Sequence, residues 1–194
     1  MNEKQSGYGQ ETYASGETYE GSFYEGRRHG EGKLRKKTIK YEGNFKHNVK
    51  EGLGKITWIE SGAYYDGEWM NNKKSGYGIM VYAKGDKHEG QYKNNKRNGQ
   101  GKTIFTNGET YQGEYLNDQR DGVGIMKYIN GEVYHGTWKG NMREGKGRLL
   151  PSYAADDESF LVNFAESEWK DDQRVNSWPL TCQGPSLNDI CRMQ

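Results

Sequence analysis

Proline, cysteine and long apolar runs are scarce in this sequence of 194 residues, which has only 3 prolines and 2 cysteines. Both cysteines, Cys182 and Cys191, lie in the last 13 residues, which argues against a secreted disulfide scaffold and against a zinc site. No apolar run approaches the roughly 20 residues of a membrane-spanning helix. The first ten residues lack the apolar centre of a signal peptide. We therefore expect a soluble, cytoplasmic protein.

Aliphatic residues are also too few for a thick core, since hydrophobic residues make up 31% and the mean hydropathy is −1.17. Such values often indicate disorder, but disordered chains contain few aromatic residues, and here 13% are aromatic. The 28 glycines and 15 tyrosines favour many short strands and turns around a thin core of rings. The net charge of +1 gives no reason to expect nucleic acid as a partner.

The sequence contains an internal repeat, and a repeat decides the fold class before any single motif does. Six similar tripeptides begin 22, 24, 23, 23 and 23 residues apart. An aromatic residue follows four positions after each start, and a Gly-x-Gly begins eleven positions after it. The tripeptides are YEG at 19–21, YEG at 41–43, YDG at 65–67, HEG at 88–90, YQG at 111–113 and YHG at 134–136.

Each repeat is predicted to form a β-hairpin of about 23 residues. In Tyr-x-Gly-x-aromatic, Tyr111, Gly113 and Tyr115 share one face of a strand and the intervening residues the other. A polar segment such as LNDQRDG is then expected to turn, a second strand to run from the Gly-x-Gly, and Asn-Gly to close it. The glycine between the two rings leaves room for a ring from a neighbouring strand. Stacked hairpins bury what a single hairpin cannot.

The pattern resembles the MORN repeat (membrane occupation and recognition nexus), strongly over residues 19–150 and weakly over 7–18. The resemblance implies an all-β, single-layer antiparallel β-hairpin repeat solenoid. We expect an N-terminal segment with a partial repeat at 1–18, six repeats at 19–150, a degenerate capping repeat and linker at 151–185, and a short tail at 186–194. We expect this tail to be irregular or partly helical, since the motif Ser-x-x-Asp at 186–189 resembles a capping box.

A row of basic residues is the first candidate site, because position nine of every repeat is basic. If the hairpins stack in register, this basic ladder could bind anionic lipid head groups or an acidic protein. The alternative is structural, since acidic residues in four of the leading tripeptides (Glu20, Glu42, Asp66 and Glu89) could neutralise neighbouring basic residues. The ladder consists of Arg28, Lys50, Lys74, Arg97, Arg120 and Arg143.

The aromatic face of the sheet is the second candidate. A one-layer sheet cannot cover both of its faces, so the rings could line a groove that accepts a partner. The alternative is that they form the core, and both interpretations can hold for different rings. The candidate groove consists of Tyr65, Trp69, Tyr92, Tyr111, Tyr115, Tyr134 and Trp138.

No catalytic, cofactor or metal site is expected. The stretch GNMREGKG at 140–147 resembles a phosphate-binding loop, but Gly147 stands where that motif has Ser or Thr. The same frame recurs in KNNKRNGQG at 93–101, so the match is a coincidence of one repeat. The histidines lack metal-ligand spacing and the carboxylates are scattered.

The expected function is a non-catalytic scaffold that binds other proteins. The resemblance to radial-spoke and other cytoskeletal MORN proteins implies partners in a cytoskeletal complex, in particular the ciliary axoneme. The alternative, implied by similar repeats near membranes, is a peripheral module that binds anionic phospholipids through the basic ladder. Open edge strands at the ends of the array also permit a homo-oligomer.

Overall fold

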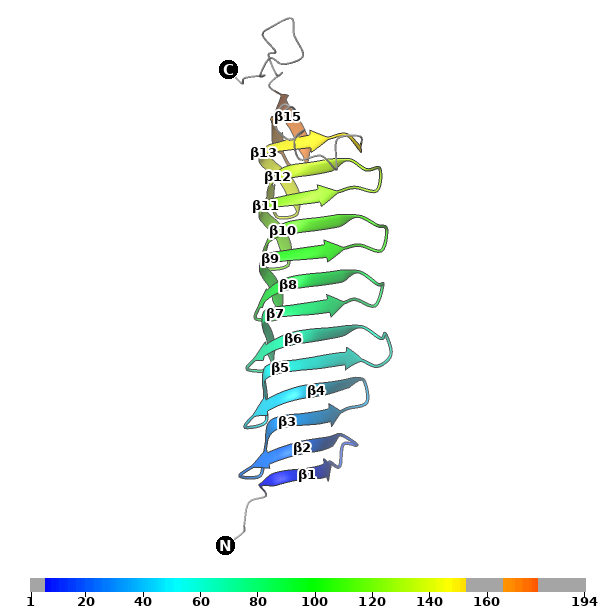
Figure 1. The fold of residues 1–194 in the computed structure, drawn as a ribbon, viewed down its shortest axis with the longest axis vertical. Helices are drawn as coiled ribbons and strands as arrows, with labels where there is room; N and C mark the ends of the chain where they lie inside the picture. The colour runs from blue at the N-terminus through cyan, green and yellow to red at the C-terminus, as the bar shows by residue number, and fades with distance from the viewer. Residues whose placement is uncertain (1–5, 153–165, 178–194) are drawn as a thin grey trace, which may run out of the picture. The chain divides into compact units, whose positions relative to one another are not determined.

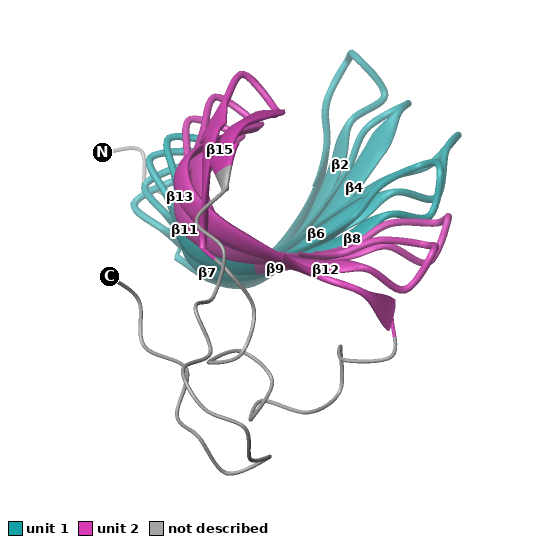
Figure 2. Ribbon diagram, turned by 90° about the horizontal axis from the view of Figure 1, so that it is seen from above, with its two compact units in different colours: residues 1–101 teal, residues 102–194 magenta. Residues whose placement is uncertain are grey.

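The computed structural model describes residues 6–152 and 166–177, and these residues form fifteen β-strands. The strands follow chain order in a single antiparallel sheet (Figure 1). This arrangement confirms the predicted all-β, single-layer hairpin fold. The predicted tail at 186–194 lies outside the described residues. The chain divides into two compact units, residues 1–101 and 102–194, which we describe separately (Figure 2).

Unit 1 contains four hairpins that each begin with a Tyr-x-Gly or His-x-Gly strand, preceded by a single strand. Neighbouring strands pair antiparallel throughout β1 to β8. The strands are β1 (Gly7–Thr12), β2 (Thr18–Tyr24), β3 (Arg27–Arg35), β4 (Ile39–Lys46), β5 (Val49–Trp58), β6 (Tyr64–Met70), β7 (Lys73–Val81), β8 (Lys87–Lys93) and β9 (Lys96–Ile104), the last of which ends in unit 2.

Unit 2 contains two further regular hairpins and a short final one. The segment that resembled a phosphate loop spans the turn of the second hairpin, between β12 and β13, as the repeat frame predicts. The strands are β10 (Thr110–Leu116), β11 (Gln119–Lys127), β12 (Val133–Lys139), β13 (Met142–Leu150), β14 (Ser167–Lys170) and β15 (Gln173–Ser177).

The turns differ from the sequence prediction in one respect. Two-residue turns lie inside the polar segments, where Asn71 and Asn72 both adopt a left-handed conformation with φ of 51° and 63°. Asparagine tolerates this conformation, which matches the twist of the flanking strands. The predicted Asn-Gly turn at 130–131 instead belongs to a five-residue loop, closed by the Tyr128 N–H that donates to the Glu132 carbonyl. The second strand of each repeat therefore starts earlier than the Gly-x-Gly.

The strand register places the buried rings of the core on one face, which we call the ring face. Tyr65 lies opposite Met80, and Gly67 opposite Gly78. The intervening residues point to the other face, which we call the outer face. The glycine pairs permit a close approach, because a Cβ on Gly67 would lie 2.5 Å from the Cα of Gly78. The strands of each unit bend along their length (Figure 2).

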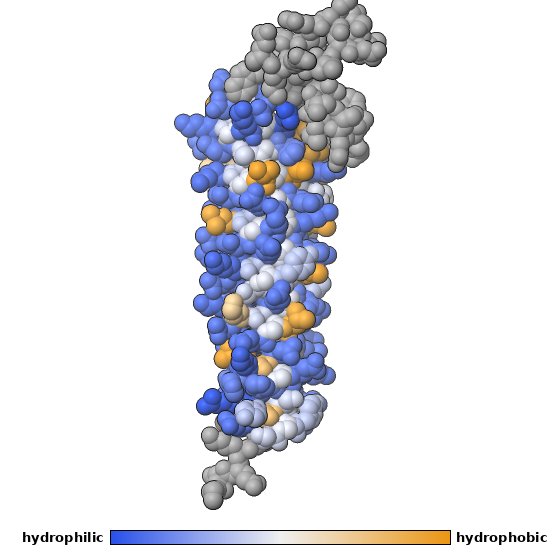
Figure 3. All heavy atoms as spheres, turned by 60° about the vertical axis from the view of Figure 1, so that its left-hand side comes forward, coloured by the Kyte–Doolittle hydropathy of each residue, from blue (hydrophilic) through white to orange (hydrophobic). Residues whose placement is uncertain are grey.

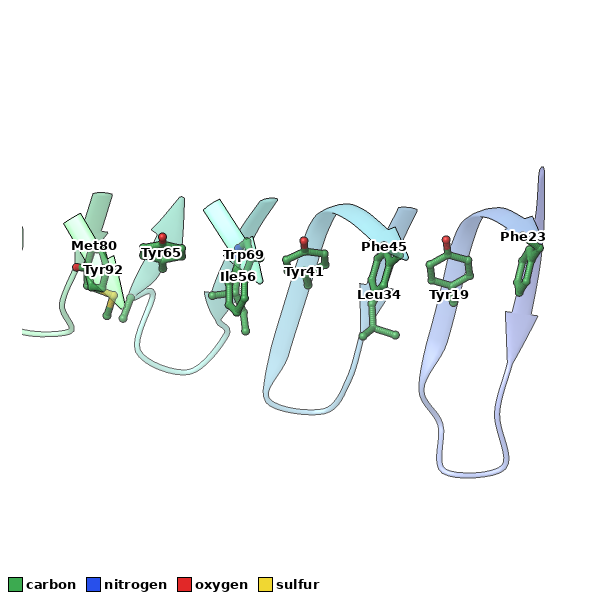
Figure 4. Close-up of a cluster of buried hydrophobic side chains, with 11 residues drawn as sticks. Tyr19, Phe23, Leu34, Tyr41, Phe45, Ile56, Tyr65, Trp69, Met80 and Tyr92 are labelled. Carbon is green, nitrogen blue, oxygen red and sulfur yellow. The ribbon is translucent and has the colours of Figure 1, made fainter. Parts of the chain in front are cut away.

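The core of each unit is therefore a row of rings. In unit 1 the rings follow one another from hairpin to hairpin (Figure 4), and each of those in the cluster is at most 6% exposed. Unit 2 has a separate cluster built in the same way around Tyr111 and Tyr134. Hydrophilic residues cover most of the face drawn in Figure 3, where hydrophobic residues form small separate patches. Within the described residues, no helix is long and apolar enough to cross a membrane.

Candidate functional site

The rings contact one another edge to face, and these contacts join consecutive repeats. Tyr41 packs against Phe45 of its own repeat with ring centroids 5.1 Å apart and against Trp69 of the next repeat at 5.5 Å. Tyr111 in unit 2 does the same with Tyr115 at 5.2 Å and Trp138 at 5.4 Å. Such pairs contribute about 0.5–1.5 kcal/mol each beyond their area burial. The rings therefore join consecutive hairpins in addition to the backbone pairing of their adjoining strands.

The seven rings of the candidate groove are all buried. Their exposed fractions range from 0% for Tyr65, Tyr111 and Tyr134 to 6% for Trp69. Burial raises the pKa of Tyr134 to about 12, and its hydroxyl donates to the Thr137 carbonyl. Their placement is that of a core, and a partner could reach them only by displacing the side chains that cover them. The proposed role as a docking groove stays a prediction.

The basic ladder covers the ring row. Each of the six ladder residues is half-buried. Arg120 places its guanidinium carbon 4.2 Å from the centroid of Trp138 in the next repeat and 5.6 Å from Tyr111 in its own. Lys50 places its ammonium 4.3 Å from Trp69. A cation over a ring face contributes about 0.5–2 kcal/mol, more as water is excluded.

Lys74, Arg143 and Arg28 also place their cations over rings. Lys74 lies over Tyr65 and Tyr92 at 5.4 and 5.1 Å, and Arg143 lies 4.0 Å from Trp169. Arg28 lies over Phe45 at 5.6 Å and forms an ion pair of 2.9 Å with Glu17. Arg97 lies on β9. Burial lowers the pKa of the Lys50 ammonium.

Two acidic residues of the leading tripeptides do pair with neighbouring basic residues, as the structural alternative expected, but these partners are not ladder residues. The acidic residues of the tripeptides lie on the outer face, opposite the ladder side chains. Asp66 forms an ion pair of 3.9 Å with Lys55, and Glu89 one of 3.2 Å with Lys87. Glu20 accepts a hydrogen bond from the Tyr8 hydroxyl. The ladder cations contact rings instead, and two of them pair with acidic residues outside the tripeptides.

A row of asparagine and aspartate side chains holds the ladder in register, and the sequence interpretation missed it. The Asn72 side chain accepts from the backbone N–H of Lys50 at 2.9 Å, while the backbone N–H of Asn72 donates to the Lys50 carbonyl at 3.1 Å. The signal was present, since Asn or Asp stands seven positions after the start of five repeats. The same bond joins Asn48 to Arg28, Asn95 to Lys74, Asn141 to Arg120 and Asp172 to Arg143.

The final hairpin, β14–β15, repeats the pairing of a buried ring with a basic residue, but at positions that the sequence interpretation did not predict. Trp169 lies opposite Gly145 and is 4% exposed, and Arg174 lies opposite Trp169 at the ladder position. In the sequence, Phe160 and Phe164 keep the four-residue spacing of the two rings of a repeat and are the reason to expect a degenerate repeat here, but both lie outside the described residues. The divisions proposed at 151–185 and 186–194 stay predictions.

The histidine and acidic side chains of the described residues are the possible ligands for a metal ion. Within residues 6–152 and 166–177, no group of three or more His, Cys, Asp or Glu side chains could hold a metal ion. His29 and His47 do contact each other, with ring centroids 5.0 Å apart. Both also contact Tyr24, so they form a small aromatic cluster at the turns of the first two repeats.

The ladder is expected to support stability. Replacing Arg120 with methionine keeps most of the aliphatic stem and removes the cation over Trp138, so we expect the free energy of unfolding to fall by about 1–2 kcal/mol. Lys139→Met, at an exposed position of the next repeat, is the matched control and should cost under about 0.5 kcal/mol. Urea unfolding followed by tryptophan fluorescence measures both. Equal stability of the two variants would mean that the Arg120 charge is free to serve a ligand.

Comparison with known proteins identifies the repeat. The model of the MORN repeat family matches residues 2–18, 19–38, 41–61, 65–87, 88–110, 111–133 and 134–151. Alsin from Rattus norvegicus is 33% identical over 96 residues, and alsin from Homo sapiens 35% identical over 86. Each match covers 44% of this chain and only 6% or 4% of the alsin sequence.

Among solved structures, the TCP domain of SAS-4 (dCPAP) of Drosophila melanogaster, in complex with a proline-rich motif of Ana2, gives a TM-score of 0.41 with 14% sequence identity. It covers 74% of this chain and 84% of that domain. A likeness at this level carries no argument about fold or function.

Proposed function

The chain belongs to the MORN-repeat family, whose non-enzymatic repeats mediate interactions with proteins or with membrane lipids, and we propose that this protein is a non-catalytic scaffold that binds other proteins. The observation that carries the proposal is that the two faces of the sheet differ: one is packed with buried rings, and the other exposes large side chains. The ring face holds the buried rings and the basic-ladder side chains that lie over them. The outer face instead exposes large side chains, among them Leu53 at 64% and Tyr77 at 52%.

We propose a cytoskeletal assembly in the cytoplasm as the setting, and more specifically the ciliary axoneme. This part rests on the similarity of the repeats to those of radial-spoke and other cytoskeletal MORN proteins. Imaging of a tagged protein expressed in ciliated cells tests it directly. Signal spread through the cytoplasm, with none along the cilium, would remove the axoneme from the proposal while leaving the scaffold role open.

The scaffold role has its own test, which is the size of the native particle. A tagged chain purified from cells under gentle conditions should sediment in a gradient with large complexes and bring specific proteins with it. The matched control is the same chain carrying Gly124→Ala, which is expected to be less stable because a Cβ at this position would clash with the ring of Tyr111. Recovery of the intact chain solely as a free monomer would contradict the proposal.

Lipid binding through the turns is the second candidate, favoured by three exposed cations. Arg27, Lys73 and Lys96 each precede a ladder residue and are exposed. Co-sedimentation with vesicles containing phosphatidylserine should show no binding if the scaffold proposal is right. If binding occurs and the triple change of these residues to glutamine abolishes it, the membrane alternative replaces the scaffold proposal.

A further inference from the structure

The outer face of unit 1 has an acidic centre, although residues 1–150 as a whole carry 25 basic against 19 acidic residues. The strand register aligns residues from consecutive strands in rows across the sheet. The first row is Glu20, Lys33, Glu42, Lys55, Asp66 and Glu89, with Ile79 between the last two.

A second row lies two residues along each strand from the first, at a distance of about 7 Å. We call the two rows together the central stripe. The stripe holds six carboxylates and two ammonium groups, a net charge of −4. The second row is Glu31, Asn44, Leu53, Glu68, Tyr77 and Gln91.

The charges of the stripe differ in how far they are already engaged: Glu68 accepts a hydrogen bond from the Tyr77 N–H and Glu89 pairs with Lys87, whereas among the described residues Lys33 and Glu42 lack such contacts. Lys33 and Glu42 lie on neighbouring strands, yet within the described residues neither side chain has an ion-pair partner within 4.0 Å. The ion pair between Lys55 and Asp66 has an N–O distance of 3.9 Å. Exposed ion pairs of this kind contribute at most about 1 kcal/mol to stability. Basic residues such as Arg35 and Lys40 lie beyond the stripe, toward the strand ends.

The stripe also has two apolar contact points and a hollow. Leu53 on β5 and Tyr77 on β7 are both more than half exposed, and they lie two strand spacings, about 10 Å, apart. A hollow of about 520 Å³ beside Leu53 has the backbone of Gly43 and Gly54 in its lining. A partner side chain can therefore approach the sheet closely at this point.

We propose that the central stripe binds a basic amphipathic α-helix of a partner protein, laid across the strands. This inference rests on the proposed scaffold function and names the face and the partner class. Strands β2 to β8 already pair along both edges, so an extended segment crossing them would leave its own backbone groups unpaired. A helix satisfies its backbone internally, and its diameter of about 10–12 Å covers two rows.

The spacing of the stripe fits the same occupant. Residues seven positions apart on a helix face are separated by about 10.5 Å, close to the separation of Leu53 and Tyr77. Lysine or arginine beside that apolar line would meet Glu42, Asp66 and Glu68. An anionic membrane and the stripe of a second copy carry the same sign as these carboxylates, so both are repelled.

Fluorescence anisotropy with designed peptides tests the proposal on the full chain. The probe is a labelled 18-residue helical peptide with leucine along one face and lysine beside it. The controls are a scrambled peptide of equal composition without an apolar face, and a peptide with glutamate in place of lysine. We expect only the first to bind, and Glu42→Lys with Asp66→Lys to weaken it at least tenfold. Glu25→Lys with Glu60→Lys makes the same change in net charge at exposed positions outside the stripe and should leave affinity unchanged.

The outcomes separate the two proposals. Binding of the scrambled peptide as tight as that of the helix, or equal affinity of the two double variants, would overturn the helix site. Thermal unfolding of each variant verifies that it is folded. In the cellular pull-down, partners that remain bound to Glu42→Lys with Asp66→Lys would overturn the site and leave the scaffold function standing. Failure of the unmodified chain to capture any partner would overturn the scaffold function itself.

Discussion

Gly124→Ala is expected to lower the free energy of unfolding by about 3 kcal/mol, because it inserts a methyl group into the space of a ring. A Cβ at this position would lie 2.5 Å from Cζ and 2.6 Å from Cε2 of Tyr111. Tyr111 is fully buried, and its hydroxyl donates to the Glu114 carbonyl at 3.0 Å. The ring therefore has nowhere to move without losing this bond and its contacts with two other rings.

The matched control is Gly108→Ala, which separates packing from backbone strain. Gly108 has a φ of 93°, and a Cβ at this position would meet no heavy atom within 4 Å, so alanine there costs only the left-handed conformation, about 1–2 kcal/mol. Gly124 has no positive φ, and its cost comes from the ring. Urea unfolding measures both variants. If Gly124→Ala costs no more than Gly108→Ala, the ring is not the reason for this glycine.

The repeated unit could be predicted because its elements obey local rules. Alternation of Tyr65, Gly67 and Trp69 assigns three residues to one face of one strand, whatever the rest of the chain does. The contacts of the ladder could not be predicted in this way. Lys50 lies over Trp69, which is 19 residues away, and that contact exists only once two hairpins stack in a definite register.

The outer face was missed for the same reason. Glu42 and Lys55 are 13 residues apart, and they become neighbours through the cross-strand register. The sequence interpretation could pair the acidic residues only with neighbouring basic residues in general, without saying which basic residues share their face. A search for charge along each face, with the register known, would have found the central stripe.

Trp69→Ala is expected to have the largest effect, a loss of about 3–5 kcal/mol. Trp69 is 6% exposed and contacts Tyr41 and Tyr65 edge to face at 5.5 and 5.4 Å. Alanine removes both ring contacts and uncovers Lys50, whose ammonium lies 4.3 Å from the tryptophan ring. It also leaves the Gly54 carbonyl without the indole N–H that donates to it at 2.8 Å.

Trp69→Phe divides this loss into its parts. Two repeats carry phenylalanine at the same position, Phe23 and Phe45, and both are buried in edge-to-face contact with tyrosine. Phenylalanine should therefore keep the ring contacts and lose mainly the indole hydrogen bond, at a cost of about 1–2 kcal/mol. Thermal and urea unfolding, followed by circular dichroism, compare the two variants with the unmodified chain. A phenylalanine variant as unstable as the alanine one would show that the indole hydrogen bond, and not the row of rings, joins the repeats at this position.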